Sequence, residues 1–283
     1  MRHWPVARSA TDVFLRCCPP EVVRRAEPEG WSPRLWRELE MTGLAAAGTE
    51  LPLAEAAEVV RVAAAFAAPV PLAETVLVGW LCGAGAPPGP LSLVHRGRAS
   101  YGRVAAALLS GDGFLLPEDA GLVPAVNLAG EPLDRTNVAD AAGADVLRLG
   151  ALIRAVQMVG AMERVLELTV VLAGDRRQLT VLAGEVASAV TAVEHAVEFP
   201  GDVEVAAAKV RAGEAATSAA AVAHRLHGAA GLTHQHELGL YTRRLWSWRD
   251  DFGGEAEWSG VPGRSVLRDP GLLWGHAPAR GTD

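Results

Sequence analysis

The stretch Arg225–Gly253, RLHGAAGLTHQHELGLYTRRLWSWRDDFG, decides how the rest of the chain is organised. An Ala-rich helix reaches it from about Val203, and Gly228 and Gly231 interrupt that helix. Glycine allows a backbone to approach a ligand or another chain with no side chain in between. Thr233 is a good N-cap residue, so we expect a new helix after it, whose free N–H groups would suit a phosphate or pyrophosphate.

The rest of the chain divides by composition into helical, strand-forming and again helical parts. Residues 1–85 read as helices; for example, Ser32 and Pro33 mark a helix start and Gly43 its end. Residues 86–143 carry short apolar runs separated by Gly, Pro and Asp, which is typical of short antiparallel strands.

Long Ala-rich helices return in residues 144–255 and predict a four-helix bundle. Residues 256–283, rich in Gly, Pro and Trp, predict an extended tail that docks on another subunit through Trp258 or Trp274. The predicted fold is therefore mainly α with a small β unit: an N-terminal helical bundle, a reduced antiparallel β domain and a C-terminal four-helix bundle.

Composition excludes several classes of function. The net charge of −7 argues against a nucleic-acid partner. No apolar run reaches the roughly 18 residues that a membrane span needs. The N-terminus lacks the apolar core of a signal peptide, so we expect a cytoplasmic protein. The absence of a P-loop, a G-x-G-x-x-G turn and a Ser-His-Asp elbow argues against NTPase, NAD-dependent and hydrolase activities.

Three blocks of sequence carry a family resemblance: LHGAAGLTHQHELGLYTRRLW at 226–246, LAGDRRQL at 172–179 and NLAGEPLD at 127–134. Together they resemble the acyl-CoA dehydrogenase family, and most closely its short actinobacterial type, which often works as one half of a heteromeric enzyme. The resemblance implies FAD as cofactor, an acyl-CoA substrate, α,β-dehydrogenation, and electron transfer to an electron-transferring flavoprotein. It also implies a homodimer or a heterotetramer with a related subunit.

The block at 172–179 supplies two cofactor-binding candidates. Arg176 stands where the family has an arginine that binds the flavin pyrophosphate across a subunit interface, and Gln178 belongs to the same motif. A planar guanidinium with fixed donors suits a diphosphate. The alternative interpretation of Arg176 is a solvated arginine beside Asp175 at a helix end.

The Gly-rich turn supplies four more: His227, Gly228, Gly231 and Thr233 match the turn that contacts the dinucleotide of the neighbouring subunit. The alternative is a helix C-cap followed by a packing glycine. The histidines of this region could also be taken for a metal cluster, but no Asp, Glu or Cys completes a ligand pattern, so no metal site is predicted.

The reaction that the resemblance implies needs a carboxylate that removes an acidic α-proton. In many family members a glutamate follows the signature arginine, here Arg243, by about nine residues. That count ends at Phe252, and the acidic residues just before it make Asp251 the candidate base, with Asp250 the second choice. The alternative is that both aspartates pair with Arg249 and its neighbours at a helix end.

Two functions of different classes follow. The first is a catalytic FAD-dependent acyl-CoA dehydrogenase subunit. The second is a non-catalytic structural or regulatory subunit of a heteromeric acyl-CoA dehydrogenase. The second is favoured by the short β unit, by the lack of the family's flavin-contacting stretch, by the residues missing after Gln178 and by the absent glutamate. A helical binding module with no link to acyl-CoA is a third option.

Overall fold

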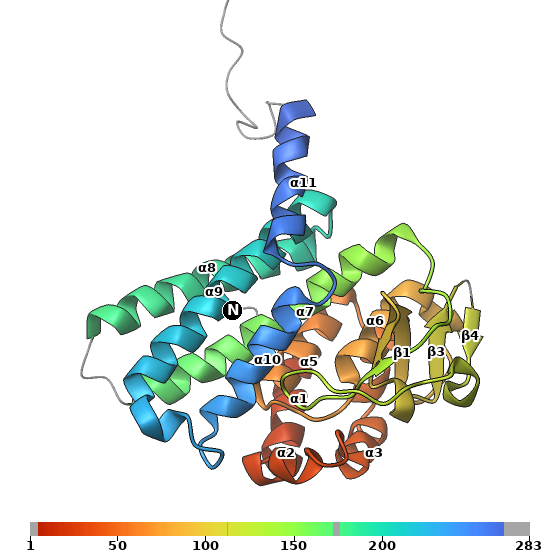
Figure 1. Cartoon of the computed structure of the whole chain (residues 1–283), viewed down its shortest axis with the longest axis horizontal. Helices are drawn as coiled ribbons and strands as arrows, with labels where there is room; N and C mark the ends of the chain where they lie inside the picture. Colours follow the sequence, from red (N-terminus) through yellow and green to blue (C-terminus); the bar gives the residue numbers. More distant parts are fainter. Residues whose placement is uncertain (1–4, 112, 172–175, 269–283) are drawn as a thin grey trace, which may run out of the picture.

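The computed structural model describes residues 5–111, 113–171 and 176–268 and shows a helical body with one small sheet at its side (Figure 1). The N-terminal part is helical, as predicted. Its α-helices are α1 (Pro5–Cys17), α2 (Pro20–Ala26), α3 (Pro33–Met41), α4 (Ala47–Glu50), α5 (Leu53–Ala65) and α6 (Leu72–Cys82).

Helix α3 shows how local sequence sets these elements. The Ser32 hydroxyl accepts the Leu35 N–H, and Pro33 occupies the first helical position, where no N–H is needed. Gly43 follows the helix with φ +77°, a conformation that glycine adopts without strain. The predicted start and end signals of this helix are confirmed.

The sheet has five strands: β1 (Leu91–His95), β2 (Arg98–Ser100), β3 (Ala107–Ser110), β4 (Gly113–Leu115) and β5 (Leu133–Arg135), in the order β4-β3-β1-β2-β5. Three of the pairings between these strands are antiparallel, but β1 and β3 are parallel. The prediction of a purely antiparallel unit is therefore wrong at this pair. The chain returns through β2 and a short turn before β3, so that β3 runs in the direction of β1.

The two faces of the sheet meet different surroundings. Val94, Ala99 and Leu108 point into a small separate core under the loops of the β unit. Leu91 and Leu93, on the opposite face of β1, belong to the main core shared with the helices. The sheet thus presents one face to the helical body, and this face borders the site described below.

The C-terminal part contains the helices α7 (Ala144–Val170), α8 (Arg176–Glu198), α9 (Asp202–Gly231), α10 (Leu238–Asp250) and α11 (Glu255–Arg268). Helix α7 lies at the centre and packs against α5, α8, α9 and α10. Small residues permit close approach: a Cβ at Gly160 would lie 2.1 Å from the carbonyl oxygen of Arg61 on α5. Two helical layers therefore share one continuous core around α7.

Two local predictions are wrong. Helix α10 begins at Leu238 rather than after Thr233, because the Thr233 hydroxyl instead donates to Ala230 O at the end of α9, while His236 Nδ1 accepts the Leu238 N–H. The first part of the segment that we expected to be an extended tail is instead the helix α11, and Trp258 is buried within its own chain. Trp274 lies outside the described residues.

In the described part of the chain, no helix is both long and apolar enough to cross a membrane. The cytoplasmic location stays a prediction.

Candidate active site

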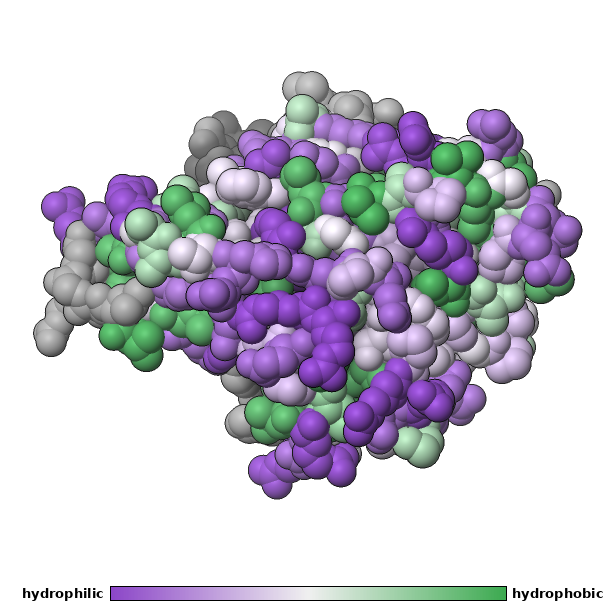
Figure 2. Space-filling model, turned by 60° about the horizontal axis from the view of Figure 1, so that its bottom comes forward, coloured by the Kyte–Doolittle hydropathy of each residue, from purple (hydrophilic) through white to green (hydrophobic). Residues whose placement is uncertain are grey.

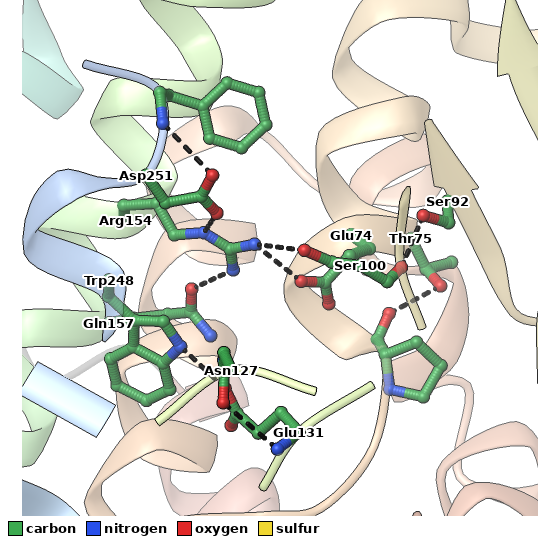
Figure 3. A network of polar contacts seen from close by, with 12 residues as sticks. Glu74, Thr75, Ser92, Ser100, Asn127, Glu131, Arg154, Gln157, Trp248 and Asp251 are labelled. Atoms are coloured by element: carbon green, nitrogen blue, oxygen red, sulfur yellow. Dashed lines mark hydrogen bonds and ion pairs between the residues drawn. The ribbon is translucent and has the colours of Figure 1, made fainter. Parts of the chain in front are cut away.

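A hollow opens where one face of the sheet meets α6, α7 and the corner between α10 and α11. The polar side chains at its narrow inner part include Glu74, His95, Arg98, Ser100, Arg154 and Asp251, and its wider part is also lined by Arg96, Tyr101, Asn127, Glu131, Ser247, Trp248 and Asp250. Figure 3 shows Glu74, Ser100 and Asp251 converging on the guanidinium of Arg154 from three different elements. Residues far apart in the sequence thus form one polar site.

Arg154 is the centre of this site, with a side chain only 4% exposed. Its Nε donates to Asp251 Oδ2 at 2.8 Å, and its Nη2 donates to Glu74 Oε1 at 2.8 Å and to Ser100 Oγ at 3.2 Å. Burial opposes the charge, but the carboxylates of Glu74 and Asp251 outweigh it and raise the pKa of Arg154 above its usual value. A buried cation is tolerated only with such partners.

Glu74 is a second carboxylate at the site, and it was not among the predicted site residues. It lies on α6, and its side chain is 7% exposed. Burial raises the pKa of Glu74, with Arg154 acting in the opposite direction. The signal that could have identified it is a single carboxylate within an otherwise apolar helix, because a charge there is retained only with a partner or a role.

The two adjacent aspartates proposed as the base have different partners in the structure. Asp251 directly follows α10 and faces the hollow: Oδ2 accepts from Arg154, and Oδ1 accepts the Phe252 N–H at 3.2 Å. Asp250 also lines the hollow, but its side chain is exposed and pairs with Arg249 at 3.0 Å rather than with Arg154. The pairing with Arg249 that we considered for both residues therefore holds for Asp250 and not for Asp251.

Lys209 on α9 fixes the backbone on which Asp251 stands. Its Nζ donates to Trp248 O at 2.9 Å and to Asp251 O at 2.8 Å, so it satisfies carbonyls that the end of α10 leaves free. The side chain is buried, and burial lowers the pKa of Lys209 to about 7, although the Asp251 carboxylate acts in the opposite direction.

The chain turns sharply after Asp251, and the residues of this turn are tightly packed. Phe252 has φ +53°, which is uncommon for a residue with a side chain, and its carbonyl accepts the Trp258 Nε1–H at 2.8 Å. The Phe252 ring stacks on His95 at 4.8 Å between centroids. It fills the space beside Gly150, where a Cβ would lie 2.2 Å from the ring.

A second buried ion pair supports the other side of the hollow. Glu131, from the NLAGEPLD block, pairs with Arg244 on α10 at 2.9 Å and accepts from Trp248 Nε1 at 3.1 Å. Trp248 is buried and lines the hollow, whereas Trp246 is 43% exposed. This block therefore ties the β unit to α10 beside the site.

The predicted cofactor-binding residues lie at the end of the bundle remote from Asp251. Helices α8 and α9 pack against each other and are joined by a short turn at Pro200–Gly201. Residues equally far from this turn along the two helices therefore lie at the same height, so the first residue of α8 lies level with about His224 on α9. Arg176 and Gln178, in the first turn of α8, are thus within about two turns of the bend at Gly228. Figure 1 shows the start of α8 and the end of α9 at the same end of the molecule.

This end of the bundle fits a dinucleotide in part. Gly228 breaks α9 with φ +58° and ψ −148°, is exposed, and has no atom within 4 Å of where a Cβ would lie. Gly231, in contrast, is buried against His227 and Leu238, which is the environment that the alternative interpretation as a packing glycine expects. Thr233 is exposed at the same turn.

The segments at this end of the bundle carry exposed apolar side chains: Val170, Val171, Val181 and Leu232. Figure 2 shows hydrophobic residues beside the grey segment at this end, while elsewhere on that face they are scattered among hydrophilic ones. An exposed glycine backbone beside apolar groups suits a nucleotide with a planar base.

His227 is partly exposed, but its ring is held by neighbours within the chain. Its Nε2 lies 3.3 Å from Thr169 Oγ1 and its Nδ1 lies 3.1 Å from His236 Nε2, so both ring nitrogens have partners within the chain. Burial, followed by His236, lowers the pKa of His227. Within residues 5–111, 113–171 and 176–268, no group of three or more His, Cys, Asp or Glu could hold a metal ion.

Comparison with known proteins identifies the fold. The acyl-CoA dehydrogenase IpdE2 of Mycolicibacterium smegmatis is 28% identical over 295 positions, which cover 88% of this chain and 91% of that protein. A chain of the ChsE4–ChsE5 complex from Mycobacterium tuberculosis superposes with a TM-score of 0.75 at 20% identity, covering 93% of this chain and 96% of that one. A chain of the Tcur3481–Tcur3483 steroid acyl-CoA dehydrogenase gives a TM-score of 0.78 at 17% identity, with 94% and 97% covered.

The chain has the acyl-CoA dehydrogenase fold. The resemblance drawn from the sequence blocks is thereby confirmed. No protein-family model matches the sequence. In this fold, the Asp251 hollow lies between the sheet and the helical body, and the bend at Gly228 lies at the far end of α10.

Proposed function

We propose that the chain is a subunit of a flavin-dependent acyl-CoA dehydrogenase and that the hollow around Asp251 receives the acyl thioester. One observation carries this proposal: the Asp251 carboxylate stands at the wall of a hollow, held by the buried Arg154. Buried ionic groups often reduce stability relative to apolar ones, so their concentration here indicates a functional site. The similarity to acyl-CoA dehydrogenases supports the reaction class.

In the proposed reaction Asp251 accepts the α-proton of the thioester. The Cα–H bond breaks, its electron pair forms the Cα–Cβ double bond, and a hydride leaves Cβ. Asp251 Oδ1 is the oxygen that takes the proton, because its partner is a single backbone N–H at 3.2 Å, while Oδ2 is held in the ion pair with Arg154. FAD, when bound, supplies the acceptor for the hydride.

FAD would be held by the bundle end, with Arg176 and Gln178 on α8 and Gly228 and Thr233 at the bend. Helix α10 has 13 residues, so it places the bend and Asp251 about 20 Å apart in one chain. We therefore propose that a second chain completes the site, in a homodimer or in a heterotetramer with a related subunit. The similarity to a chain of the ChsE4–ChsE5 complex supports a heteromeric assembly. An electron-transferring flavoprotein is the proposed electron acceptor.

A second candidate function, a non-catalytic subunit, is favoured by one feature of the same site. Both oxygens of Asp251 already have partners inside the chain, Arg154 and the Phe252 N–H. A carboxylate engaged in this way serves equally well to hold the corner of α10 in place.

The experiment that tests the proposal is anaerobic addition of acyl-CoA to the purified protein, alone and co-expressed with a subunit of the same fold. We expect a yellow complex whose visible flavin absorbance falls on addition of substrate. Asp251→Asn is expected to abolish the fall, and Asp250→Asn, which alters an exposed carboxylate paired with Arg249 rather than with Arg154, to leave it intact. A colourless complex, or unchanged bleaching in Asp251→Asn, would favour the non-catalytic role of this chain.

A further inference from the structure

A row of basic side chains crosses the sheet beside the Asp251 hollow. His95 on β1 is directly opposite Arg98 on β2, and Arg98 is directly opposite Arg135 on β5. Arg96 and Gly97, both with positive φ, form the two-residue turn that brings His95 and Arg98 face to face. Directly opposite residues of antiparallel strands point to the same face of a sheet. The three side chains therefore share one face.

This face is the one that meets the helical body. Ala99, which follows Arg98, points the other way into the small core of the β unit. Ser100, two residues after Arg98, contacts Arg154 in the hollow. Because side chains alternate along a strand, Arg98 shares the face of Ser100. His95 and Arg98 indeed line the hollow together with Asp251, and Arg135 stands beside them at the outer end of the row.

The positive charge of the row is not neutralised. In the part of the chain that the structure describes, neither Arg98 nor Arg135 has an ion pair or a side-chain hydrogen bond. Two arginines directly opposite each other on adjacent strands repel. Two other arginines of the β unit, in contrast, are neutralised by carboxylates: Arg96 pairs with Glu257 at 2.7 Å, and Arg103 pairs with Asp134 at 2.5 Å.

His95 adds an independent observation. Its Nε2 atom is buried and has no hydrogen-bond partner among the described residues. Buried polar atoms are nearly always satisfied, so an unpaired one at the wall of a hollow indicates a group that arrives from outside. The nearby acid Asp251 does not serve the row, because its carboxylate is bound by Arg154 and the Phe252 N–H.

We propose that the row His95–Arg98–Arg135 binds an anionic oxygen group of the substrate, either a carboxylate carried by the acyl chain or the 3′-phosphate of the CoA moiety. The proposal rests on the proposed function in that it names the substrate group received by the same hollow. A guanidinium presents paired donors that match the oxygens of either group. In this proposal Arg98 makes the principal contact with the anion. His95 lies at the inner end of the row, and Arg135 adds positive charge at its outer end.

The test is calorimetric binding to the complex with three thioesters: adipoyl-CoA, hexanoyl-CoA and hexanoyl-3′-dephospho-CoA. The first two differ only by the terminal carboxylate, and the last two only by one phosphate. Arg98→Gln is expected to weaken binding by about 10-fold, either of adipoyl-CoA alone or of the two thioesters that carry the 3′-phosphate. Arg37→Gln is the matched control, because Arg37 is an exposed arginine on α3, away from the sheet.

A loss confined to adipoyl-CoA assigns the row to a carboxylate of the acyl chain. A loss for both CoA thioesters but not for the dephospho form assigns it to the phosphate. Unchanged affinity for all three overturns the proposal. If the wild-type complex binds none of them, the proposed function fails, and the row is tested directly with inorganic phosphate and adipate. A saturable shift of the His95 ring signal that Arg98→Gln removes supports the row, and no shift overturns it.

Discussion

Lys209 is the only lysine of the chain, and its replacement by methionine tests the corner that holds Asp251. Methionine keeps the length of the apolar stem but removes the amine that donates to Trp248 O and Asp251 O. Three charged groups act on the amine: Asp251 and Asp250 favour its protonation, and Arg154 opposes it. Burial is nevertheless the largest effect and lowers the pKa of Lys209 from 10.5 to about 7.

The direction of the pH effect follows from these two values. Between about pH 7 and 10.5 the unfolded chain keeps the lysine proton and the folded chain has released it. The free energy of unfolding of the wild type therefore rises with pH in this window, by about 1.4 kcal/mol per pH unit. Below about pH 7 both states are protonated, and the contribution is constant.

The assay is urea unfolding of the wild type and of Lys209→Met at several pH values. Groups common to both proteins cancel in the difference between the two free energies of unfolding. From about pH 7 to about pH 9 this difference should move in favour of the wild type by about 2 to 3 kcal/mol. A difference that stays constant over this range would refute the reasoning, because the amine would then keep its proton when buried.

Lysine NMR gives a direct check. With isotope-labelled lysine the chain has one side-chain signal, and its titration reports the pKa of Lys209. In Asp251→Asn this pKa should fall further, because the carboxylate that favours the charged amine is gone. An unchanged or higher pKa in that variant would show that Asp251 does not face the amine.

Other consequences can be measured by the same unfolding assay. Gly150→Ala should lower the free energy of unfolding by about 1–3 kcal/mol, because its Cβ would meet the Phe252 ring at 2.2 Å. Gly184→Ala, with no atom within 4 Å of its Cβ, should instead raise it by up to about 1 kcal/mol; equal effects would contradict the packing described. Arg154→Met should cost about 3–5 kcal/mol, because Glu74 then stays buried without its cation. Adding Glu74→Gln should recover part of that loss, and strictly additive losses would disprove the coupling.

The fold was predictable where elements are long. Apolar residues at helical spacing, with proline and glycine at the breaks, predicted the N-terminal helices and the long helices of the bundle. The sheet was predicted less well because β2 and β5 have only three residues each, too few to show alternation. The parallel pairing of β1 with β3 depends on the path of the chain between them, which no local pattern encodes.

The site was predictable only in part. Asp251 followed from its distance to the signature arginine, but the partners that give it a role come from elsewhere in the chain. Arg154 is 97 positions away from Asp251 and 80 from Glu74, and Lys209 is 42 positions from Asp251. Each is a charged residue within an apolar or Ala-rich helix, which signals burial but does not reveal its partner.

The most direct test of the account is exchange of the α-hydrogen of a bound acyl-CoA with deuterated water, followed by mass spectrometry. This measurement reports proton removal by the base separately from the later transfer of hydride. We predict exchange in the wild-type complex and in Asp250→Asn, and a loss of about 100-fold or more in Asp251→Asn. Exchange in Asp251→Asn at the wild-type rate would show that Asp251 is not the base and that the hollow does not perform the proposed chemistry.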